Sequence, residues 1–413
     1  MKGTCPLKLF THSLLTILLL ATVAACSSPA TSVAPTVAPK PAETSAPEPV
    51  ELFLARPDGA KGIAIAYDMS SGREEFALPA GMASASGNLF FAAEPIKDAD
   101  TKINSFDLLT GHELADYELD GRWTLSGLSP LGRWLALTRI PSESETQAWA
   151  KADEWKTEVK ILDTKTGETK HILKLDGNFE VETVSADGTS LFLVQHLPAL
   201  NPDHYVIRLY DLSQESLIAD PLRAKGSDEV MAGHAWEGLA SPNGTWLLTL
   251  YLSTRRNTAF IHTLNLVDKY PVCIDLPSGD GNFDQLKYYT LALNASKVYA
   301  ANAALGVVAE INLSLLKVTN VVEFEPGAGM LIGSDSKIQT ARNVLTKDGA
   351  KLYFTSGQNV WAYDTKTKTV SGPFLTEAFV SGLGVSSDGG RLFVAQKTGP
   401  LMTFDTTNVA ASQ

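Results

Sequence analysis

One short pattern recurs along this chain and constrains its fold more than any other feature. In each copy, a turn built from Ser, Thr or Asn with Gly, or a close variant, leads directly into an apolar and aromatic run. Asp-Gly and Asn-Gly pairs adopt positive φ readily, and β-branched and aromatic residues favour strands, so each copy predicts a β-hairpin. Seven copies begin at intervals of 40 to 56 residues and occupy 84–93, 129–138, 185–194, 241–250, 293–302, 346–355 and 386–395.

A second hairpin alternates with the first, as a strand ending in Asp or Asn, a turn and another strand. The clear copies are 103–119, 159–175, 207–216 and 360–375, and the weaker ones are 261–276 and 307–324. Two hairpins give four strands per unit, and this period with almost no helical pattern indicates a β-propeller. A pair of β-sandwiches would need Greek-key spacing without the sevenfold recurrence. We therefore predict an all-β propeller of four-stranded blades over residues 51–413.

The two ends of the repeat region read as incomplete units. Residues 51–78 look like the last three strands of a blade, and residues 379–406 look like the first three. Pairing of these N- and C-terminal strands would close the ring through one shared blade and protect edge strands that an open ring exposes. We predict seven blades on this basis; eight result if the two partial units stay separate.

The turn chemistry also carries a family resemblance. Ser185-Ala-Asp-Gly188 precedes a strand, and Asp163-Thr-Lys-Thr-Gly167 follows one. This combination resembles the YVTN-type, WD40-like propeller repeats of bacterial surface and periplasmic proteins, over essentially all of 51–413. True WD40 repeats differ, because no Trp-Asp pair ends a strand here. The resemblance implies a fold and does not select an activity, since turn motifs are shared by many propellers.

The first 25 residues predict export. Lys2 and Lys8 precede an apolar run at 14–23 that is too short to span a membrane as a stable helix. The ending Val-Ala-Ala-Cys26 resembles the lipobox of bacterial lipoproteins. That resemblance implies a signal peptide at 1–25, acylation of Cys26, and extracytoplasmic anchoring to the cell membrane or the outer membrane. The alternative is an ordinary cleaved signal with an incidental cysteine.

Residues 26–50 predict a tether after the lipidated cysteine. They consist almost entirely of Ser, Thr, Ala, Pro and Val, with no aromatic residue. Such a composition buries too little apolar surface to offset its ordering entropy, and its prolines favour an extended chain. We therefore expect three parts: signal peptide, lipidated tether, and a propeller domain over 51–413.

Charge and cysteine content exclude several classes of protein. With 34 Lys and Arg against 46 Asp and Glu, the net charge is −12, which offers no electrostatic footprint for nucleic acid. Three cysteines are too few for a disulfide framework or a multi-cysteine metal site. After export and lipidation only Cys273 remains, and its apolar neighbours predict a buried small hydrophobe.

Propeller topology separates two faces, and we expect binding on one of them. The tight turns within both hairpins share one side, whereas the connections from second to third strand and between blades share the other. Those connections are long and variable, and variable loops on a rigid scaffold usually carry binding. The longest insert, 139–158, contains Trp149 and Trp155 and has capping-box spacing from Ser142 to Glu145. These tryptophans either bind a sugar or protein, or pack the insert's short helix onto the blade.

Polar residues at the mouths of the innermost strands form a second set of candidates. A ring of acids, arginine and histidine there suits a polar ligand or acid–base chemistry, although every propeller has a solvated channel lining. The candidates are Arg122, Glu180, Glu182, His234, Glu237, Arg342 and the neighbouring Asn343.

The sequence contains few candidates for a metal site or a catalytic nucleophile. The stretch Asp280-Gly-Asn-Phe-Asp284 alternates oxygen ligands but lacks the glycine and distal acid of an EF-hand, so no cofactor is predicted and a looser calcium site stays open. His196 and His204 form an alternative zinc or copper pair. The sequence contains no Gly-x-Ser-x-Gly, His-Glu-x-x-His or P-loop motif.

Two functions follow from these observations. The first is a surface-anchored lipoprotein whose non-catalytic propeller binds a protein or an envelope polymer. The second is an enzyme, because propellers resembling this one include lactonases that open sugar lactones. Under that reading Glu180, Glu182, His234 and Arg342 are the acid–base candidates in the channel.

Overall fold

The computed structural model describes residues 51–55, 63–97, 100–152, 154–223, 231–279, 283–326 and 342–406. All of them belong to the unit Pro49–Gln413. The predicted signal peptide, Cys26 and the tether lie outside the described residues, as do 280–282 of the calcium candidate. No helix in the described ranges is long and apolar enough to cross a membrane.

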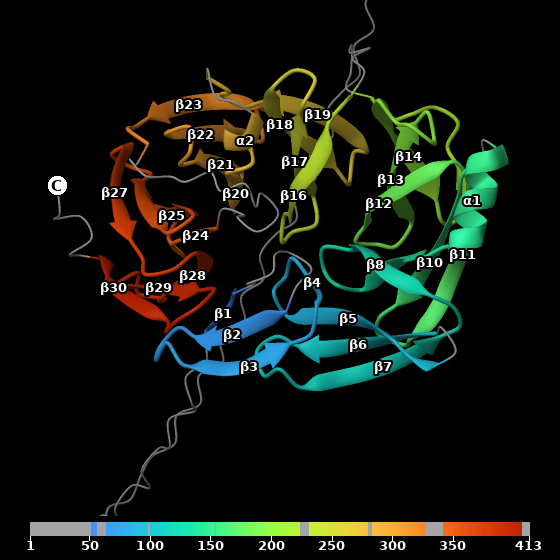
Figure 1. Ribbon diagram of the computed structural model, residues 1–413, viewed down its shortest axis with the longest axis horizontal. Helices are drawn as coiled ribbons and strands as arrows, with labels where there is room; N and C mark the ends of the chain where they lie inside the picture. The colour runs from blue at the N-terminus through green and yellow to red at the C-terminus, as the bar shows by residue number, and fades with distance from the viewer. Residues whose placement is uncertain are drawn as a thin grey trace, which may run out of the picture. The chain divides into compact units, whose positions relative to one another are not determined.

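The described residues form eight antiparallel sheets, and Figure 1 shows them arranged as the blades of a propeller around a centre. Six sheets have four strands, and the first and last have three. Blade 1 is β1 (Leu52–Ala55), β2 (Ala64–Asp68) and β3 (Glu74–Leu78); blade 2 is β4 (Gly81–Ala83), β5 (Leu89–Pro95), β6 (Thr101–Asp107) and β7 (Glu113–Leu119); blade 3 is β8 (Trp123–Leu128), β9 (Trp134–Arg139), β10 (Lys156–Asp163) and β11 (Glu168–Asp176); blade 4 is β12 (Asn178–Val184), β13 (Ser190–Leu197), β14 (His204–Asp211) and β15 (Ser216–Leu217).

The second half of the ring repeats this order, and two helices interrupt it. Blade 5 is β16 (His234–Ala240), β17 (Trp246–Ser253), β18 (Thr258–Asn265) and β19 (Tyr270–Asp275); blade 6 is β20 (Tyr289–Asn294), β21 (Lys297–Asn302), β22 (Val307–Asn312) and β23 (Lys317–Glu323); blade 7 is β24 (Asn343–Leu345), β25 (Lys351–Ser356), β26 (Asn359–Asp364) and β27 (Thr369–Leu375); blade 8 is β28 (Val380–Val385), β29 (Arg391–Gln396) and β30 (Met402–Asp405). Helix α1 (Glu143–Ala152) lies between β9 and β10, and α2 (Phe283–Leu286) precedes β20.

The all-β propeller is confirmed, with the eight blades of the alternative count. The prediction of seven blades with a shared closing blade was wrong, because β1–β3 and β28–β30 form separate sheets among the described residues. The physical reason is visible at Gly382 and Gly384 of β28. A Cβ on Gly382 would come within 2.7 Å of Ala55 in β1, and one on Gly384 within 2.3 Å of the Phe53 ring. The first and last blades therefore close the ring by face-to-face packing rather than by strand pairing.

The core lies between neighbouring blades rather than at one centre. Each interface joins apolar side chains from the facing sheets, as where Phe91 and Ile103 of blade 2 meet Leu135 of blade 3, all almost fully buried. Burial of one such side chain stabilises the fold by roughly 1.5–3 kcal/mol. Cys273 departs from the prediction, because it lies exposed on the outermost strand β19, with its Sγ 3.9 Å from His262 Nδ1.

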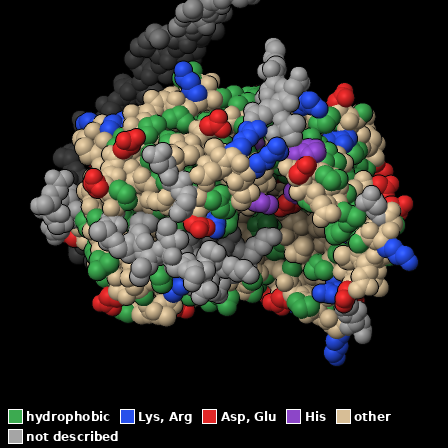
Figure 2. All heavy atoms as spheres, turned by 45° about the horizontal axis from the view of Figure 1, so that its top comes forward, with side chains coloured by type: hydrophobic (Ala, Val, Ile, Leu, Met, Phe, Trp, Pro, Cys, Tyr) green, Lys and Arg blue, Asp and Glu red, His purple; other side chains and the backbone are tan. Residues whose placement is uncertain are grey.

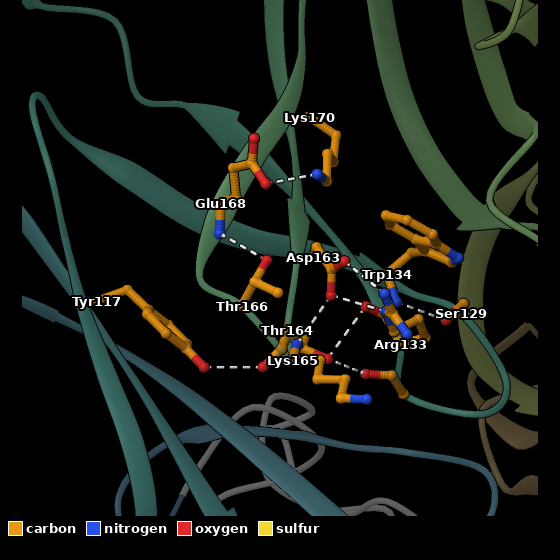
Figure 3. Close-up of polar contacts among 11 residues, drawn as sticks. Tyr117, Ser129, Arg133, Trp134, Asp163, Thr164, Lys165, Thr166, Glu168 and Lys170 are labelled. Atoms are coloured by element: carbon orange, nitrogen blue, oxygen red, sulfur yellow. Dashed lines mark hydrogen bonds and ion pairs between the residues drawn. The ribbon is translucent and has the colours of Figure 1, made fainter.

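The tight-turn face of the ring is held by satisfied polar contacts, and Figure 3 shows them in blade 3. Asp163 ends β10 with its side chain 3% exposed and accepts bonds from Arg133 Nε at 2.7 Å and Nη2 at 2.6 Å. The same carboxylate accepts the Lys165 amide at 3.0 Å. Gly167 has φ of 73°, and a Cβ there would lie 2.1 Å from the ring of Tyr117 in the neighbouring blade. These turns are therefore packing elements as well as connections.

The opposite face, called the loop face below, carries the longer connections, including helix α1. The predicted capping box is present: Ser142 N donates to Glu145 Oε2 at 2.8 Å, and Glu145 N donates to Ser142 Oγ at 3.3 Å. Arg139 contacts both Glu145 at 2.8 Å and Glu158 at 3.0 Å, and thereby holds the helix to its blade.

Candidate functional site

A recess of about 330 Å³ opens on the loop face between blades 4 and 5. Three separate connections line it: β13 to β14, β15 to β16, and β17 to β18. Figure 2 shows histidine side chains at a hollow on the molecular surface, with Lys or Arg side chains beside them. Its ionisable lining residues are His196, Asp203, His204, Tyr205, His234 and Arg255.

On one side of the recess, His196 contacts a glutamate on the innermost strand of blade 4. His196 lies near the end of β13, and its Nε2 is 3.3 Å from Glu180 Oε2 on β12. The side chain of His196 is 27% exposed and that of Glu180 is 62% exposed. This contact uses one ring nitrogen of His196 and orients the ring, as carboxylate partners of histidine commonly do.

A second histidine–carboxylate pair lies on the adjacent connection. His204 Nδ1 is 2.5 Å from Asp203 Oδ1. The hydrogen bond with His204, together with the positive charge of Arg255, holds the pKa of Asp203 below its usual value. Arg255 is exposed and lies on the connection from β17 to β18. Asp203 therefore remains ionised beside both side chains.

His234 begins β16 and is placed by the glycine before it. Gly233 has φ of 153°, and a Cβ at this position would meet the Leu252 carbonyl oxygen at 3.0 Å. Glycine thus lets the chain pass close to β17 before the innermost strand of blade 5 begins. His234 is exposed and contributes to the recess lining.

Behind the recess, two stacked tyrosines lead to a third carboxylate. The rings of Tyr205 and Tyr251 are 4.9 Å apart, and Tyr251 Oη donates to Glu182 Oε1 at 3.1 Å. The Tyr205 hydroxyl is buried and lacks a hydrogen-bond partner of ordinary geometry among the described residues. Burial raises the pKa of Glu182 to about 7, although bonds from Tyr251 and Thr249 oppose that rise. Near neutral pH this carboxyl accordingly exchanges between its protonated and ionised forms.

The other channel candidates form a separate cluster across the innermost strands of blades 5 to 8. Glu237 on β16 accepts from Thr290 Oγ1 on β20 at 3.4 Å, and Thr290 in turn accepts from Asn343 Nδ2 at 2.5 Å. Burial raises the pKa of Glu237 to about 7, opposed by the charge of Arg342. Arg342 Nε donates to the Ser381 carbonyl on β28 at 3.0 Å. This network ties four blades together.

The structure therefore divides the predicted residues. Glu180, Glu182 and His234 lie at or behind the recess, and Glu237, Arg342 and Asn343 lie in the second cluster. Arg122 precedes β8 in blade 3, outside the recess lining. Trp149 and Trp155 are both half-buried, and their rings contact each other edge to face at 5.6 Å.

Sequence reasoning missed the role of five residues. His196 and His204 entered only as a metal pair, while Tyr205, Tyr251 and Arg255 drew no attention. A group of three or more His, Cys, Asp or Glu side chains that could hold a metal is absent from the described ranges. The sequence feature that could have indicated this site was the long connection 196–205, which carries two histidines and an aspartate.

Comparison with known proteins adds the fold alone. No known family matches the sequence, and no curated protein matches it. Solved structures with similar folds include the Dos1 propeller, at 9% identity and TM-score 0.49 over 87% of this chain and 94% of that one. The Cps50 (Swd1) propeller domain of Myceliophteria thermophila has 10% identity and TM-score 0.44 over 86% and 99%. The dihydro-heme d1 dehydrogenase NirN, in complex with DHE, has 13% identity and TM-score 0.44 over 81% and 75%. Likenesses this distant carry no functional argument.

Proposed function

We propose that this chain is a lipid-anchored extracytoplasmic protein of YVTN type whose propeller binds a protein partner or an envelope polymer through the loop face. The anchor rests on the sequence of residues 1–26, with its basic start, short apolar run and terminal Val-Ala-Ala-Cys26. The tether that follows suits a domain held away from a membrane surface.

The observation that carries the binding role is the recess on the loop face. Three connections from two blades supply ionisable side chains to one concave site. On the tight-turn face, by contrast, Asp163 is enclosed by Arg133 and its own turn amides. A rigid ring that presents several hydrogen-bond donors in one recess is suited to hold a ligand group with little loss of its own freedom.

Cross-linking of the full chain in its native membrane tests this proposal. The informative variant is Arg255→Glu at the recess, and the matched control is Arg73→Glu, which makes the same charge change at an exposed residue in a tight turn. We expect a reproducible partner with the parent and the control and its loss with Arg255→Glu. A partner lost equally with both variants would contradict a loop-face role.

The anchor needs its own test. Cys26→Ser should move the protein out of the membrane fraction and abolish incorporation of labelled palmitate, whereas the parent chain should retain both. An unchanged membrane fraction for Cys26→Ser would overturn lipid anchoring and leave the recess argument intact.

One observation favours a second candidate, a hydrolase of lactonase type. Glu182 has a pKa raised to about 7 by burial and lies two residues from Glu180 on the same innermost strand. Two carboxyls in contrasting environments are how many hydrolases divide acid and base roles. Hydrolysis of sugar lactones that is lost with Glu182→Gln and kept with Glu180→Gln would establish this alternative; an inactive parent chain would exclude it.

A further inference from the structure

The recess concentrates hydrogen-bond donors and positive charge on an acidic protein. The chain as a whole carries a net charge of −12, yet Arg255 and three histidines line this one site. Asp203, the carboxylate in its lining, contacts His204, and Glu180 on the adjacent strand contacts His196. The groups left to meet a ligand are therefore mostly donors.

The histidine pairs fix which ring nitrogens are left over. His196 uses Nε2 on Glu180, so its Nδ1 remains, and His204 uses Nδ1 on Asp203, so its Nε2 remains. A histidine ring nitrogen that carries a proton donates to an oxygen acceptor. His234 and Arg255 complete the set from blade 5.

We propose that this recess binds an anionic group, a carboxylate or a tetrahedral oxyanion. This inference rests on the proposed binding role of the loop face and specifies the chemistry of what is bound. Charge-assisted bonds from guanidinium and imidazolium to an oxyanion are the strong ones in proteins. The expected ligand is the anionic end or substituent of a partner or an envelope polymer.

A cation is the opposing occupant, and the geometry disfavours it. The described residues contain no cluster of three potential metal ligands, although three histidines share the recess.

Titration calorimetry of the full chain with small anions tests the proposal. Sulfate and glucuronate are both anions near neutral pH, and glucose is the uncharged counterpart of glucuronate. We expect both anions to bind and glucose not to bind. A preference for sulfate or for glucuronate would distinguish a tetrahedral from a planar anion.

Matched variants locate the binding. Arg255→Gln and His234→Gln should each raise the dissociation constant roughly three- to tenfold. Arg73→Gln and His112→Gln, on exposed tight turns, should leave it unchanged. Equal losses with both sets, or zinc binding that displaces sulfate and requires His234, would overturn the anion site.

The failure of this inference is distinguishable from failure of the proposed function. If neither anion binds but the cross-linked partner still depends on Arg255, the loop face is a binding face and the anion chemistry is wrong. If the anions bind at the recess and no partner is found with the parent chain, the anion site stands and the partner-binding role fails.

Discussion

The two faces of this ring use the same kinds of side chain to different ends. On the tight-turn face, Asp163 is buried and bonded by Arg133 and by the Lys165 amide (Figure 3). On the loop face, Arg255 and His234 are exposed in the recess between blades 4 and 5. An arginine paired with a buried carboxylate stabilises the fold, whereas one that is exposed in a recess is accessible to a ligand.

Two glutamates sharpen the same contrast within the interior. Glu310 is 5% exposed and accepts from Tyr363 Oη at 2.8 Å, with the Lys368 ammonium on the same carboxylate. Glu182 also accepts from a tyrosine, Tyr251, but the described residues give it no ion pair. The first has its charge compensated and fits a structural role. Glu182 has a pKa raised to about 7 by burial, so its protonation state changes near neutral pH.

The largest expected effect is on the tight-turn face. Asp163→Ala removes a buried carboxylate and leaves the Lys165 amide and the Arg133 guanidinium without their acceptor. We expect the free energy of unfolding to fall by about 3 kcal/mol, measured by denaturant unfolding. Asp176→Ala in the same blade, at a 94% exposed side chain, should cost less than about 1 kcal/mol. Equal effects would remove the distinction between satisfied and open polar groups.

The second prediction concerns the pH dependence of stability through Glu182. Its carboxyl is protonated in the folded chain up to about pH 7 and ionises near 4.5 when unfolded, so it costs stability as the pH rises between these values. Glu182→Gln abolishes that loss. Relative to the parent, the variant should gain on the order of 1–3 kcal/mol between pH 4.5 and pH 8, in thermal unfolding at each pH. A constant difference across this range would show that Glu182 titrates normally.

The smallest effect is expected at helix α1 on the loop face. Ser142→Ala removes the capping hydroxyl that accepts the Glu145 amide, which should cost about 1 kcal/mol of local helix stability. Hydrogen exchange of the α1 amides should accelerate about fivefold, while amides of β10 keep their protection. Ser142→Thr retains the hydroxyl and should restore most of the protection; failure of that rescue would place the helix under the control of the Arg139 contacts alone.

The sequence was sufficient for the parts of this fold that local chemistry determines. The Asp-Gly and Asn-Gly turns at 187–188, 243–244, 348–349 and 388–389 each produced the predicted hairpin, and Ser142 with Glu145 produced the cap of α1. The number of blades could not be predicted from local sequence. It depends on how closely β28 packs against β1, which is possible because Gly382 and Gly384 carry no side chain. No turn motif reports whether two partial units share one sheet or form two.

The recess was also beyond local reasoning. Glu180, Glu182 and His234 were recognised as channel residues, but nothing near them in the sequence indicates that His196 and Arg255 lie at the same site. These residues come from three connections in two blades. Their meeting depends on the packing of blade 4 against blade 5, where Tyr205 stacks on Tyr251. A spacing rule cannot anticipate that contact.

One measurement tests the central claim directly: site-specific photo-cross-linking in the native membrane from one position on each face. A benzophenone side chain at Thr254, exposed beside the recess, is compared with one at Lys165, exposed in a tight turn. If the loop face is the binding face, cross-linked products should form from position 254 and not from position 165. Products from position 165 alone would contradict the account and move recognition to the tight-turn face.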